Sequence, residues 1–201
     1  MQLKTVQNSI RIFSQYQGTL STAQAVRLGI QPRTLYQMRD TGLLVRESRG
    51  LYRLAESLPW SDPDLVLVAR RIPKGVICLI SALHFHDLTT QIPHQVDVAL
   101  LQSSEKPRLE YPPTRFVWMG PESFAAGVEM HEMDGVRVHV FGVAKTVADC
   151  FKFRSKVGLD VAIAALRDYR HDRKGTQDEL WQAAVVDRVA RVMRPYMEAL
   201  T

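Results

Sequence analysis

Three polar residues in one short segment have the types and spacing of side chains that read DNA bases. Arg33, Thr34 and Gln37 are interleaved there with Leu35 and Met38. Arginine can pair with two acceptors on guanine, glutamine can pair with an acceptor and a donor on adenine, and threonine can contact a thymine methyl group or a phosphate. A helix with Leu35 and Met38 facing inward turns the other three outward. We therefore expect these polar side chains to lie near the DNA major groove.

The residues around this segment predict a helix-turn-helix. Ser21 and Gln24 fit a capping box, in which the serine hydroxyl accepts an early backbone N–H and the glutamine reaches back to the cap. Gly29 permits the tight turn after a short helix. The pair Gln31-Pro32 begins the next helix, because proline at the first helical position gives up no hydrogen bond that the helix would use. Two short helices joined in this way are typical of the motif.

A hairpin is expected directly after the helix-turn-helix. Two strand-like runs are joined around Ser48-Arg49-Gly50, so that Arg49 lies at the tip. A hairpin in this place makes a winged helix, with Arg49 positioned to follow the DNA backbone or the adjacent minor groove. The elements expected in this first domain are helices over residues 5–16, 22–28 and 32–41 and strands over residues 43–47 and 51–54.

Further side chains complete the expected DNA interface. Thr22 and Gln24 lie near a helix start and are placed to donate to phosphate. For Tyr36 two roles stay open, packing on the wing or reaching a phosphate. The candidate DNA-binding residues are Thr22, Gln24, Gln31, Arg33, Thr34, Tyr36, Gln37 and Arg49.

The excess positive charge of the chain is confined to this N-terminal segment. Residues 1–56 contain eight basic residues, seven of them arginine, against three acidic ones, which accounts for the whole net charge of +5. The rest of the chain has eighteen residues of each sign. A polyanionic partner and an ordinary solvated basic surface both fit this asymmetry. Because no acidic residue occurs between Gln24 and Arg39, we favour DNA over a protein-interaction role for the winged helix.

Composition and motifs argue against several other classes of protein. The chain has no apolar run near the roughly 18 residues that a membrane span needs, and its first residues do not resemble a signal peptide, so we expect a cytoplasmic protein without a membrane partner. Cys78 and Cys150 lie in apolar segments and are expected to be buried, reduced thiols. The sequence contains no glycine-rich phosphate loop and no nucleophile elbow. We therefore expect no catalytic residue and no cofactor.

Histidine pairs do not predict a metal site. His84 and His86 are two residues apart, which on a helix points their side chains in nearly opposite directions. His131 and His139 lie on two expected hairpin strands, where they could approach each other, but no third ligand is evident. We expect no metal.

The remainder of the chain, residues 58–201, is expected to form a larger mixed α+β domain with a helical C-terminal region, after an N-terminal domain over residues 1–57. Ser81 is expected to cap a short helix, and Asp134-Gly135 to form a hairpin turn. The other expected elements are helices over residues 64–71, 143–154 and 159–169, one or two helices over residues 176–200, a buried strand or tight entry over residues 75–80, and strands over residues 95–101 and 115–119.

A set of charged residues in this second domain has two interpretations. Lys145 and Asp149 are four apart on an expected helix, which favours an ordinary surface ion pair. The alternative is a contact surface for a partner or a nucleic acid. Arg188, Arg191 and Arg194 recur at helical spacing, and their role is open. The possible C-terminal functional surface comprises Lys145, Asp149, Lys152, Arg154, Arg188 and Arg191.

Four stretches together resemble the AbiEi family of antitoxins from type IV toxin–antitoxin systems. The resemblance extends over almost the entire chain, and its more particular part is ISALHFHDLT followed by KTVADCFKFRSKVGLDVAIAAL. The stretches are LSTAQAVRLGIQPRTLYQMRDTGLLVRESRGLYRL, LISALHFHDLT, VHVFGVAKTVADCFKFRSKVGLDVAIAALRDY and VARVMRPYMEAL.

The resemblance implies a bacterial repressor that binds inverted repeats of double-stranded DNA in its own promoter. It places the DNA-reading helix at Pro32–Thr41 and the wing at Leu43–Leu54. It implies also a C-terminal domain that counteracts a nucleotidyltransferase toxin without a stable toxin complex. It supplies no catalytic residue for that domain, and it leaves the oligomeric state open.

Three other hypotheses compete with this one. The first is a stand-alone winged-helix transcriptional regulator whose C-terminal domain senses a ligand or mediates dimerisation. The second is a protein-interaction adaptor that uses the winged helix without DNA. An enzyme is the least supported, because the sequence names no nucleophile, metal cluster or general base with a partner.

Overall fold

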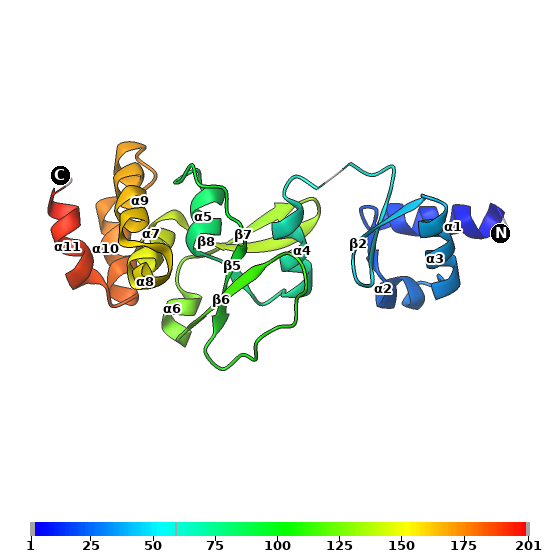
Figure 1. Cartoon of the computed structure of the whole chain (residues 1–201), viewed down its shortest axis with the longest axis horizontal. Helices are drawn as coiled ribbons and strands as arrows, with labels where there is room; N and C mark the ends of the chain where they lie inside the picture. Colours follow the sequence, from blue (N-terminus) through cyan, green and yellow to red (C-terminus); the bar gives the residue numbers. More distant parts are fainter. Residues whose placement is uncertain (1–2, 59, 200–201) are drawn as a thin grey trace. The chain divides into compact units, whose positions relative to one another are not determined.

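The computed structural model describes residues 3–58 and 60–199 of the 201-residue chain. The chain divides into two compact units, Met1–Pro63 and Asp64–Thr201 (Figure 1). Residues 58–63, which we had assigned to the second domain, are grouped with the first unit. The division of function between the two domains stays a prediction. The mixed α+β class expected from the sequence is confirmed.

The N-terminal unit is a helix-turn-helix followed by a hairpin, with one further short strand. β3 is the central strand of a three-stranded antiparallel sheet in the order β1-β3-β2. The sequence did not predict β1, because three residues are too few to show an alternating pattern. The elements are α1 (Leu3–Gln15), β1 (Thr19–Ser21), α2 (Thr22–Arg27), α3 (Pro32–Asp40), β2 (Leu44–Ser48) and β3 (Leu51–Leu54).

Local signals set the starts of α2 and α3 as expected. The Gln24 backbone N–H donates to Ser21 Oγ at 3.2 Å, and the Ser21 N–H donates to Gln24 Oε1 at 2.9 Å, which completes the capping box. Pro32 occupies the first turn of α3. Leu35 and Met38 are fully buried and join Phe13 in the core of this unit. That burial fixes which face of α3 is left for solvent.

The C-terminal unit contains a five-stranded mixed sheet in the order β6-β5-β4-β8-β7. β5 runs parallel to β6 and β4 runs parallel to β8, while the β4–β5 and β7–β8 pairs are antiparallel. From α4 onward the elements are α4 (Pro63–Arg71), β4 (Val76–Ile77), α5 (Leu79–Phe85), β5 (Val96–Leu101), β6 (Thr114–Met119), α6 (Pro121–Ala125), β7 (Val128–Met133), β8 (Val136–Phe141), α7 (Val143–Lys152), α8 (Arg154–Val157), α9 (Leu159–His171), α10 (Gln177–Val186) and α11 (Ala190–Ala199).

α7 is the central helix of this unit, because it packs against α5, α9, α10 and α11. Every residue from Lys145 to Phe151 is buried, so the helix has almost no solvent face over two turns. Phe141, Phe151 and Tyr169 are among the largest buried side chains of the surrounding core. The predicted turn at Asp134-Gly135 joins β7 to β8, with positive φ at both residues.

One sequence-based expectation about this unit is wrong, and one short helix of it was not predicted. Ser81 does not cap α5, because the helix begins at Leu79 with Cys78 as its N-cap. Ser81 lies inside the helix, where its hydroxyl accepts from the Asp97 N–H at 2.9 Å and donates to the Gln95 carbonyl at 3.3 Å. The short helix α6 was not predicted, because five residues are too few for a helical repeat.

The two cysteines are buried thiols, and the described helices are too short or too polar to suggest a membrane span. Cys78 and Cys150 are free and fully buried, as expected, and burial raises the pKa of both thiols well above the usual value. Of the helices that the structure describes, none combines the length and the apolar character that crossing a membrane requires.

Candidate nucleic-acid interface

The solvent face of α3 presents the predicted base-reading residues. Arg33 and Gln37 are exposed, and within the described chain their side chains have no hydrogen bond or ion pair. Thr34 is half-buried. Because Leu35 and Met38 anchor the opposite face, the orientation of Arg33 and Gln37 is set by the core. Their side chains remain available for a ligand.

Tyr36 lies on the same exposed face, where its ring contacts a charged neighbour. The guanidinium of Arg39 lies 5.5 Å from the centre of the Tyr36 ring. Arg39 in turn donates from Nε to Asp40 Oδ1 at 2.8 Å, and its Nη2 is 2.6 Å from the same oxygen. This contact among Tyr36, Arg39 and Asp40 has no signature in the sequence, because it depends on the directions of the three side chains.

The tip of the wing is attached to the start of α2. The Thr22 N–H donates to the Gly50 carbonyl at 2.9 Å, and the Thr22 hydroxyl approaches the same oxygen at 3.4 Å. Ser21 pairs with Leu51 in the sheet, which brings the turn residue Arg49 beside this helix start. Arg49 is exposed. The structure therefore brings Thr22 and Arg49 together, but the Thr22 hydroxyl is already occupied by the wing.

Two glutamines flank the helix starts. Gln24 is exposed and uses its carbonyl oxygen in the capping box, which leaves its amide NH₂ as the group able to donate to a phosphate. Gln31 is the N-cap of α3, is exposed, and makes no side-chain cap hydrogen bond. Both predicted residues therefore lie at the surface near helix N-termini, where backbone N–H groups favour an anion.

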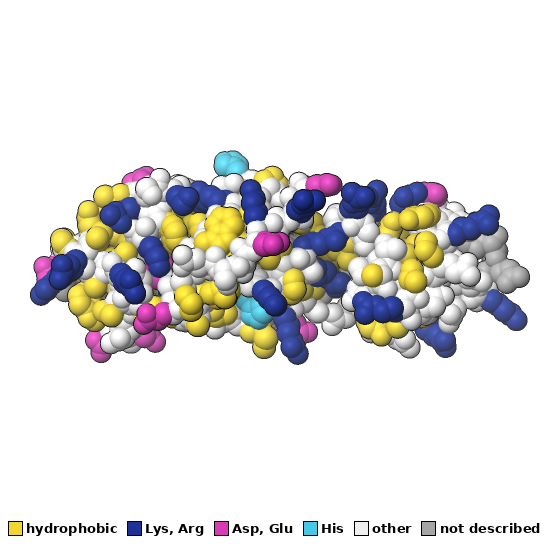
Figure 2. Space-filling view, turned by 90° about the horizontal axis from the view of Figure 1, so that it is seen from below, with side chains coloured by type: hydrophobic (Ala, Val, Ile, Leu, Met, Phe, Trp, Pro, Cys, Tyr) yellow, Lys and Arg dark blue, Asp and Glu magenta, His cyan; other side chains and the backbone are white. Residues whose placement is uncertain are grey.

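Not all of the arginines of this unit are equally available to a partner. Arg53 is bound by Glu47 at 2.5 Å and donates to the carbonyls of Leu54 and Ser57, so it holds the base of the wing. The β-bulge between Arg46 and Ser48 places Glu47 for this contact. On the face drawn in Figure 2, Lys and Arg side chains lie over both units, while acidic side chains lie mostly on the C-terminal unit.

In the C-terminal unit, the expected surface ion pair is buried. Lys145 Nζ lies 2.5 Å from Asp149 Oδ1, and the two side chains are 3% and 0% exposed. The interpretation of Lys145 and Asp149 as a surface pair is therefore wrong. The i, i+4 spacing was correct, but the burial of α7 on all sides comes from helices that are distant in sequence.

The buried pair belongs to a larger polar cluster. Lys145 Nζ also lies 3.1 Å from Asp187 Oδ2, and Asp187 Oδ1 accepts from the Ser123 hydroxyl at 2.6 Å. Lys152 donates to Ser123 Oγ at 2.9 Å and lies 3.4 Å from Asp187. Ser123 and Asp187 were not identified from the sequence, because no local motif connects α6 to the end of α10.

Burial raises the pKa of Asp149 well above its usual value of 3.8. Lys145 opposes this shift, whereas the nearby Asp187 carboxylate adds to it. Asp149 Oδ2 and Asp187 Oδ2 are buried without a directed hydrogen bond in the described chain. Lys145 is therefore the cation that both buried carboxyl groups share, and the cluster connects α7 to the end of α10.

The remaining basic residues of the predicted C-terminal surface are exposed, unlike Lys145 and Asp149. Arg154 is exposed in α8 and donates to the Phe151 carbonyl at 2.9 Å. Arg188 and Arg191 are exposed, but Arg188 lies in the turn before α11, with φ of +59°, and is not part of a continuous helical stripe. The six residues therefore do not form one surface.

His131 and His139 do not approach each other across the hairpin. His131 pairs across the hairpin with Val138, so His131 and His139 point to opposite faces of the sheet. His86 Nε2 lies 2.7 Å from the Phe141 carbonyl oxygen, and burial lowers the pKa of His86.

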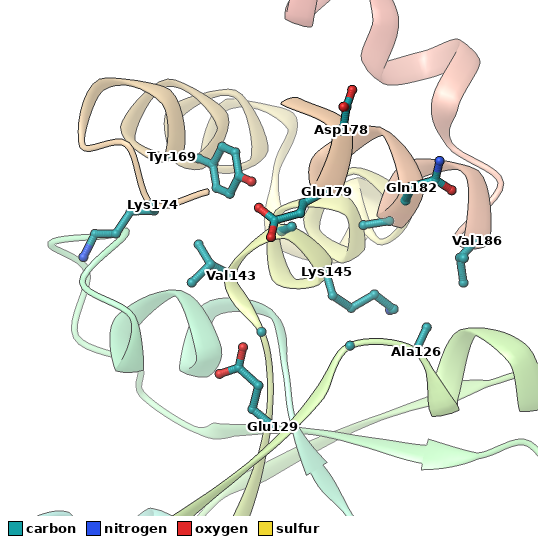
Figure 3. A pocket seen from close by; sticks show the side chains of 14 residues that line it. Ala126, Glu129, Val143, Lys145, Tyr169, Lys174, Asp178, Glu179, Gln182 and Val186 are labelled. Atoms are coloured by element: carbon teal, nitrogen blue, oxygen red, sulfur yellow. The ribbon is translucent and has the colours of Figure 1, made fainter. Parts of the chain in front are cut away.

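A pocket of about 550 Å³ lies beside the first turn of α7 (Figure 3). The carboxylates of Glu129 and Glu179 project into it from opposite walls, and the stem of Lys145 forms part of its floor. Gly127 has a φ of +64°, and a Cβ there would lie 2.9 Å from the Lys145 Cβ, so glycine is required at that wall. The pocket is lined by Ala126, Gly127, Glu129, Gly142, Val143, Ala144, Lys145, Tyr169, Lys174, Asp178, Glu179, Gln182, Ala183 and Val186.

A solved structure shares the fold. The crystal structure of the RV2827C protein from Mycobacterium tuberculosis matches with a TM-score of 0.53 at 14% sequence identity, over 94% of this chain and 80% of that chain. At this identity the likeness concerns the fold alone. No curated protein matches the sequence.

The sequence of the N-terminal unit matches a family model. Residues 9–55, from α1 to the end of the wing, match the model described as "Transcriptional regulator, AbiEi antitoxin". The matched range contains every candidate residue of the interface built above. Residues 9–55 are thus similar to the AbiEi antitoxin transcriptional regulators, which confirms the resemblance for this part of the chain.

Proposed function

We propose that the protein is a DNA-binding repressor that acts on its own operon through the winged helix, and an antitoxin through its C-terminal domain. The observation on which this rests is the exposed face of α3. Arg33 and Gln37 project from it without a partner in the described chain, on a helix held by Leu35 and Met38. The family of residues 9–55 supports a regulatory role.

The chemistry of this face suits the major groove. A guanidinium at Arg33 can donate to two guanine acceptors, and the Gln37 amide can accept from and donate to adenine. Arg49 at the wing tip and the Gln24 amide, near the start of α2, are placed to contact phosphates on either side. In this arrangement the base contacts determine which DNA sequence is recognised, and the phosphate contacts fix the position of the protein along the duplex.

The partners follow from this arrangement. We propose that two copies of the chain bind the two halves of an inverted repeat, because a twofold DNA site matches a pair of identical readers. The resemblance to the AbiEi family adds a nucleotidyltransferase toxin as the functional counterpart, without a stable complex. Because a bacterial promoter lies in the cytoplasm, we propose that the protein acts there.

A second candidate function is a ligand-responsive regulator. The pocket of about 550 Å³ in the C-terminal unit favours it, because this volume falls in the range of small-molecule sites. Native mass spectrometry of the purified protein checks this possibility. A bound small molecule that changes DNA affinity would favour ligand sensing, whereas toxin neutralisation by a ligand-free chain would favour the antitoxin.

The decisive experiment is a titration of the full-length protein against its own upstream DNA in the presence of excess competitor DNA. We expect sequence-specific retardation by the wild-type chain and its loss in the double variant Arg33→Ala/Gln37→Ala. The matched control is Gln7→Ala/Arg167→Ala, which removes the same side-chain types from exposed positions outside the interface. Equal binding to upstream and competitor DNA by the wild type would contradict the proposal.

A further inference from the structure

We propose that Arg39 is a positioning residue of the DNA interface, which neutralises Asp40 and supports Tyr36 without itself contacting a phosphate. This inference rests on the proposed function. A basic residue in a DNA-reading helix would ordinarily be assigned to a phosphate contact. The contacts of Arg39 within α3 argue for a different role.

Asp40 lies on the same face of α3 as the predicted base-reading residues. Arg33, Tyr36, Gln37 and Asp40 follow the i, i+3, i+4, i+7 spacing of a single helical face. Asp40 therefore continues the stripe that carries the base-reading side chains, and it is exposed. A carboxylate at this place repels the phosphates that flank the groove. A DNA-reading face needs this charge to be compensated.

Arg39 supplies the compensation. Its Nε and Nη2 both approach Asp40 Oδ1, at 2.8 Å and 2.6 Å. Two nitrogens of the guanidinium thus contact one carboxylate oxygen. The net charge of the pair is zero, so DNA is not repelled by an isolated carboxylate. The side chains are 37% and 62% exposed, so the pair contributes little to folding stability, and its effect belongs to the interface.

The same guanidinium also lies against Tyr36. The ring centre is 5.5 Å from Arg39 Cζ, within the range of a cation–π contact. Tyr36 is 46% exposed, so this contact limits the directions in which its hydroxyl can point. Arg39 thereby neutralises the charge of Asp40 and also restricts the orientation of the Tyr36 ring.

The test uses the full-length chain in four forms: wild type, Arg39→Ala, Asp40→Asn and the double variant Arg39→Ala/Asp40→Asn. Affinity for the upstream DNA is measured at several salt concentrations. We expect Arg39→Ala to weaken binding by about five-fold, because one uncompensated surface charge near a phosphate corresponds to about 1 kcal/mol. The double variant removes both charges, and we expect it to return to within about two-fold of the wild type.

The salt dependence separates positioning from direct contact. A side chain that neutralises a phosphate adds roughly 0.9 to the slope of log affinity against log salt. If Arg39 only compensates Asp40, the wild type and the double variant have the same slope. A double variant that stays weak, with a slope lower by roughly 0.9, would show that Arg39 contacts a phosphate and would overturn the inference.

A matched pair in the C-terminal unit controls for global charge. Arg194 and Glu198 form an exposed i, i+4 pair at 2.9 Å in α11, and the corresponding variants are Arg194→Ala, Glu198→Gln and their combination. These should leave DNA binding unchanged. The contact with Tyr36 is checked without DNA by NMR, where Arg39→Ala should shift the Tyr36 ring protons and Asp40→Asn should shift them less. Ring protons that do not shift in Arg39→Ala would contradict the inference that Arg39 supports Tyr36.

Failure of this inference is distinguishable from failure of the proposed function. A wild-type chain that shows no sequence-specific binding overturns the function, and the role of Arg39 in it. A wild-type chain that binds specifically, with no recovery in Arg39→Ala/Asp40→Asn, overturns the role of Arg39 alone.

Discussion

The ammonium group of Lys145 lies 3.1 Å from the carboxylate of Asp187, which joins the first turn of α7 to the residue that ends α10. Both side chains are almost completely excluded from water, at 3% and 0% exposure. Asp187 also accepts from Ser123 of α6, so one carboxylate holds three helices. Ion pairs of this kind fix which elements meet, since an incorrect arrangement would leave a buried charge without a partner.

Removal of the cation should therefore destabilise the C-terminal unit. Lys145→Met keeps the length and apolar stem of the side chain but removes the cation between Asp149 and Asp187, and leaves only Lys152, at 3.4 Å from Asp187, as a nearby positive charge. We expect a loss of about 3 to 5 kcal/mol in the free energy of unfolding, measured by urea denaturation with a probe in this unit.

Arg194→Met is the matched control for this change. It breaks an ion pair at the surface of the same unit, where both side chains are more than half exposed. The expected loss is at most about 1 kcal/mol. Similar small losses in Lys145→Met and Arg194→Met would show that the buried cluster contributes no more than a surface pair.

Single substitutions in α3 should separate specific from nonspecific DNA binding. Arg33→Ala and Gln37→Ala each remove a side chain that has no partner in the described chain, so the fold should be unaffected. We expect each to weaken binding to the specific site by about 1 to 3 kcal/mol, with nonspecific binding largely intact. Gel retardation on operator and scrambled duplexes measures both. Equal losses on the two DNAs would contradict base reading.

The wing should contribute through charge and not through sequence. Arg49→Ala removes an exposed guanidinium from the hairpin tip, beside the start of α2. We expect weaker binding to every duplex and a salt slope lower by roughly 0.9, as for one phosphate contact. Arg71→Ala, at the end of α4, is the control outside the interface. An unchanged slope with altered base preference would assign Arg49 to the minor groove instead.

Much of the N-terminal unit could be predicted because its signals are local. Ser21, Gln24 and Pro32 mark helix starts by rules that involve three or four neighbouring residues. Leu35 and Met38 show the inner face by their spacing alone, and so the outward direction of Arg33 followed without tertiary information. β1 escaped because a three-residue strand is defined by its partner β3 and not by its own pattern.

The C-terminal unit was less predictable because its important contacts join distant segments. Lys145 and Asp149 have the same spacing whether they face water or the core, and only the packing of α9 and α10 against α7 decides between these. Asp187 and Ser123 have no sequence signal for their contact. Ser81 was misassigned as a cap because serine suits a helix start, whereas here the Asp97 backbone uses its hydroxyl.

His86 should make the C-terminal unit less stable at mildly acidic pH. Burial lowers its pKa below the usual 6.5, and nearby His131 and Lys174 add to this, while the Phe141 carbonyl and Glu129 oppose it. Because the folded-state pKa is below the unfolded-state value, the folded protein binds fewer protons in this range. The contribution to stability is fully present above pH 6.5 and is lost as pH falls through the lowered pKa.

NMR titration of the histidine ring protons checks this, with His171 as an internal comparison, because its hydrogen bond to Asp172 raises the pKa of His171 above 6.5. The His86 signal should titrate at a lower pH than the His171 signal. In His86→Gln, the free energy of unfolding should fall less between pH 6.5 and the lowered pKa of His86 than it does in the wild type. A His86 signal that titrates above 6.5 would mean that the Phe141 carbonyl and Glu129 outweigh burial, and the sign of the pH dependence would then reverse.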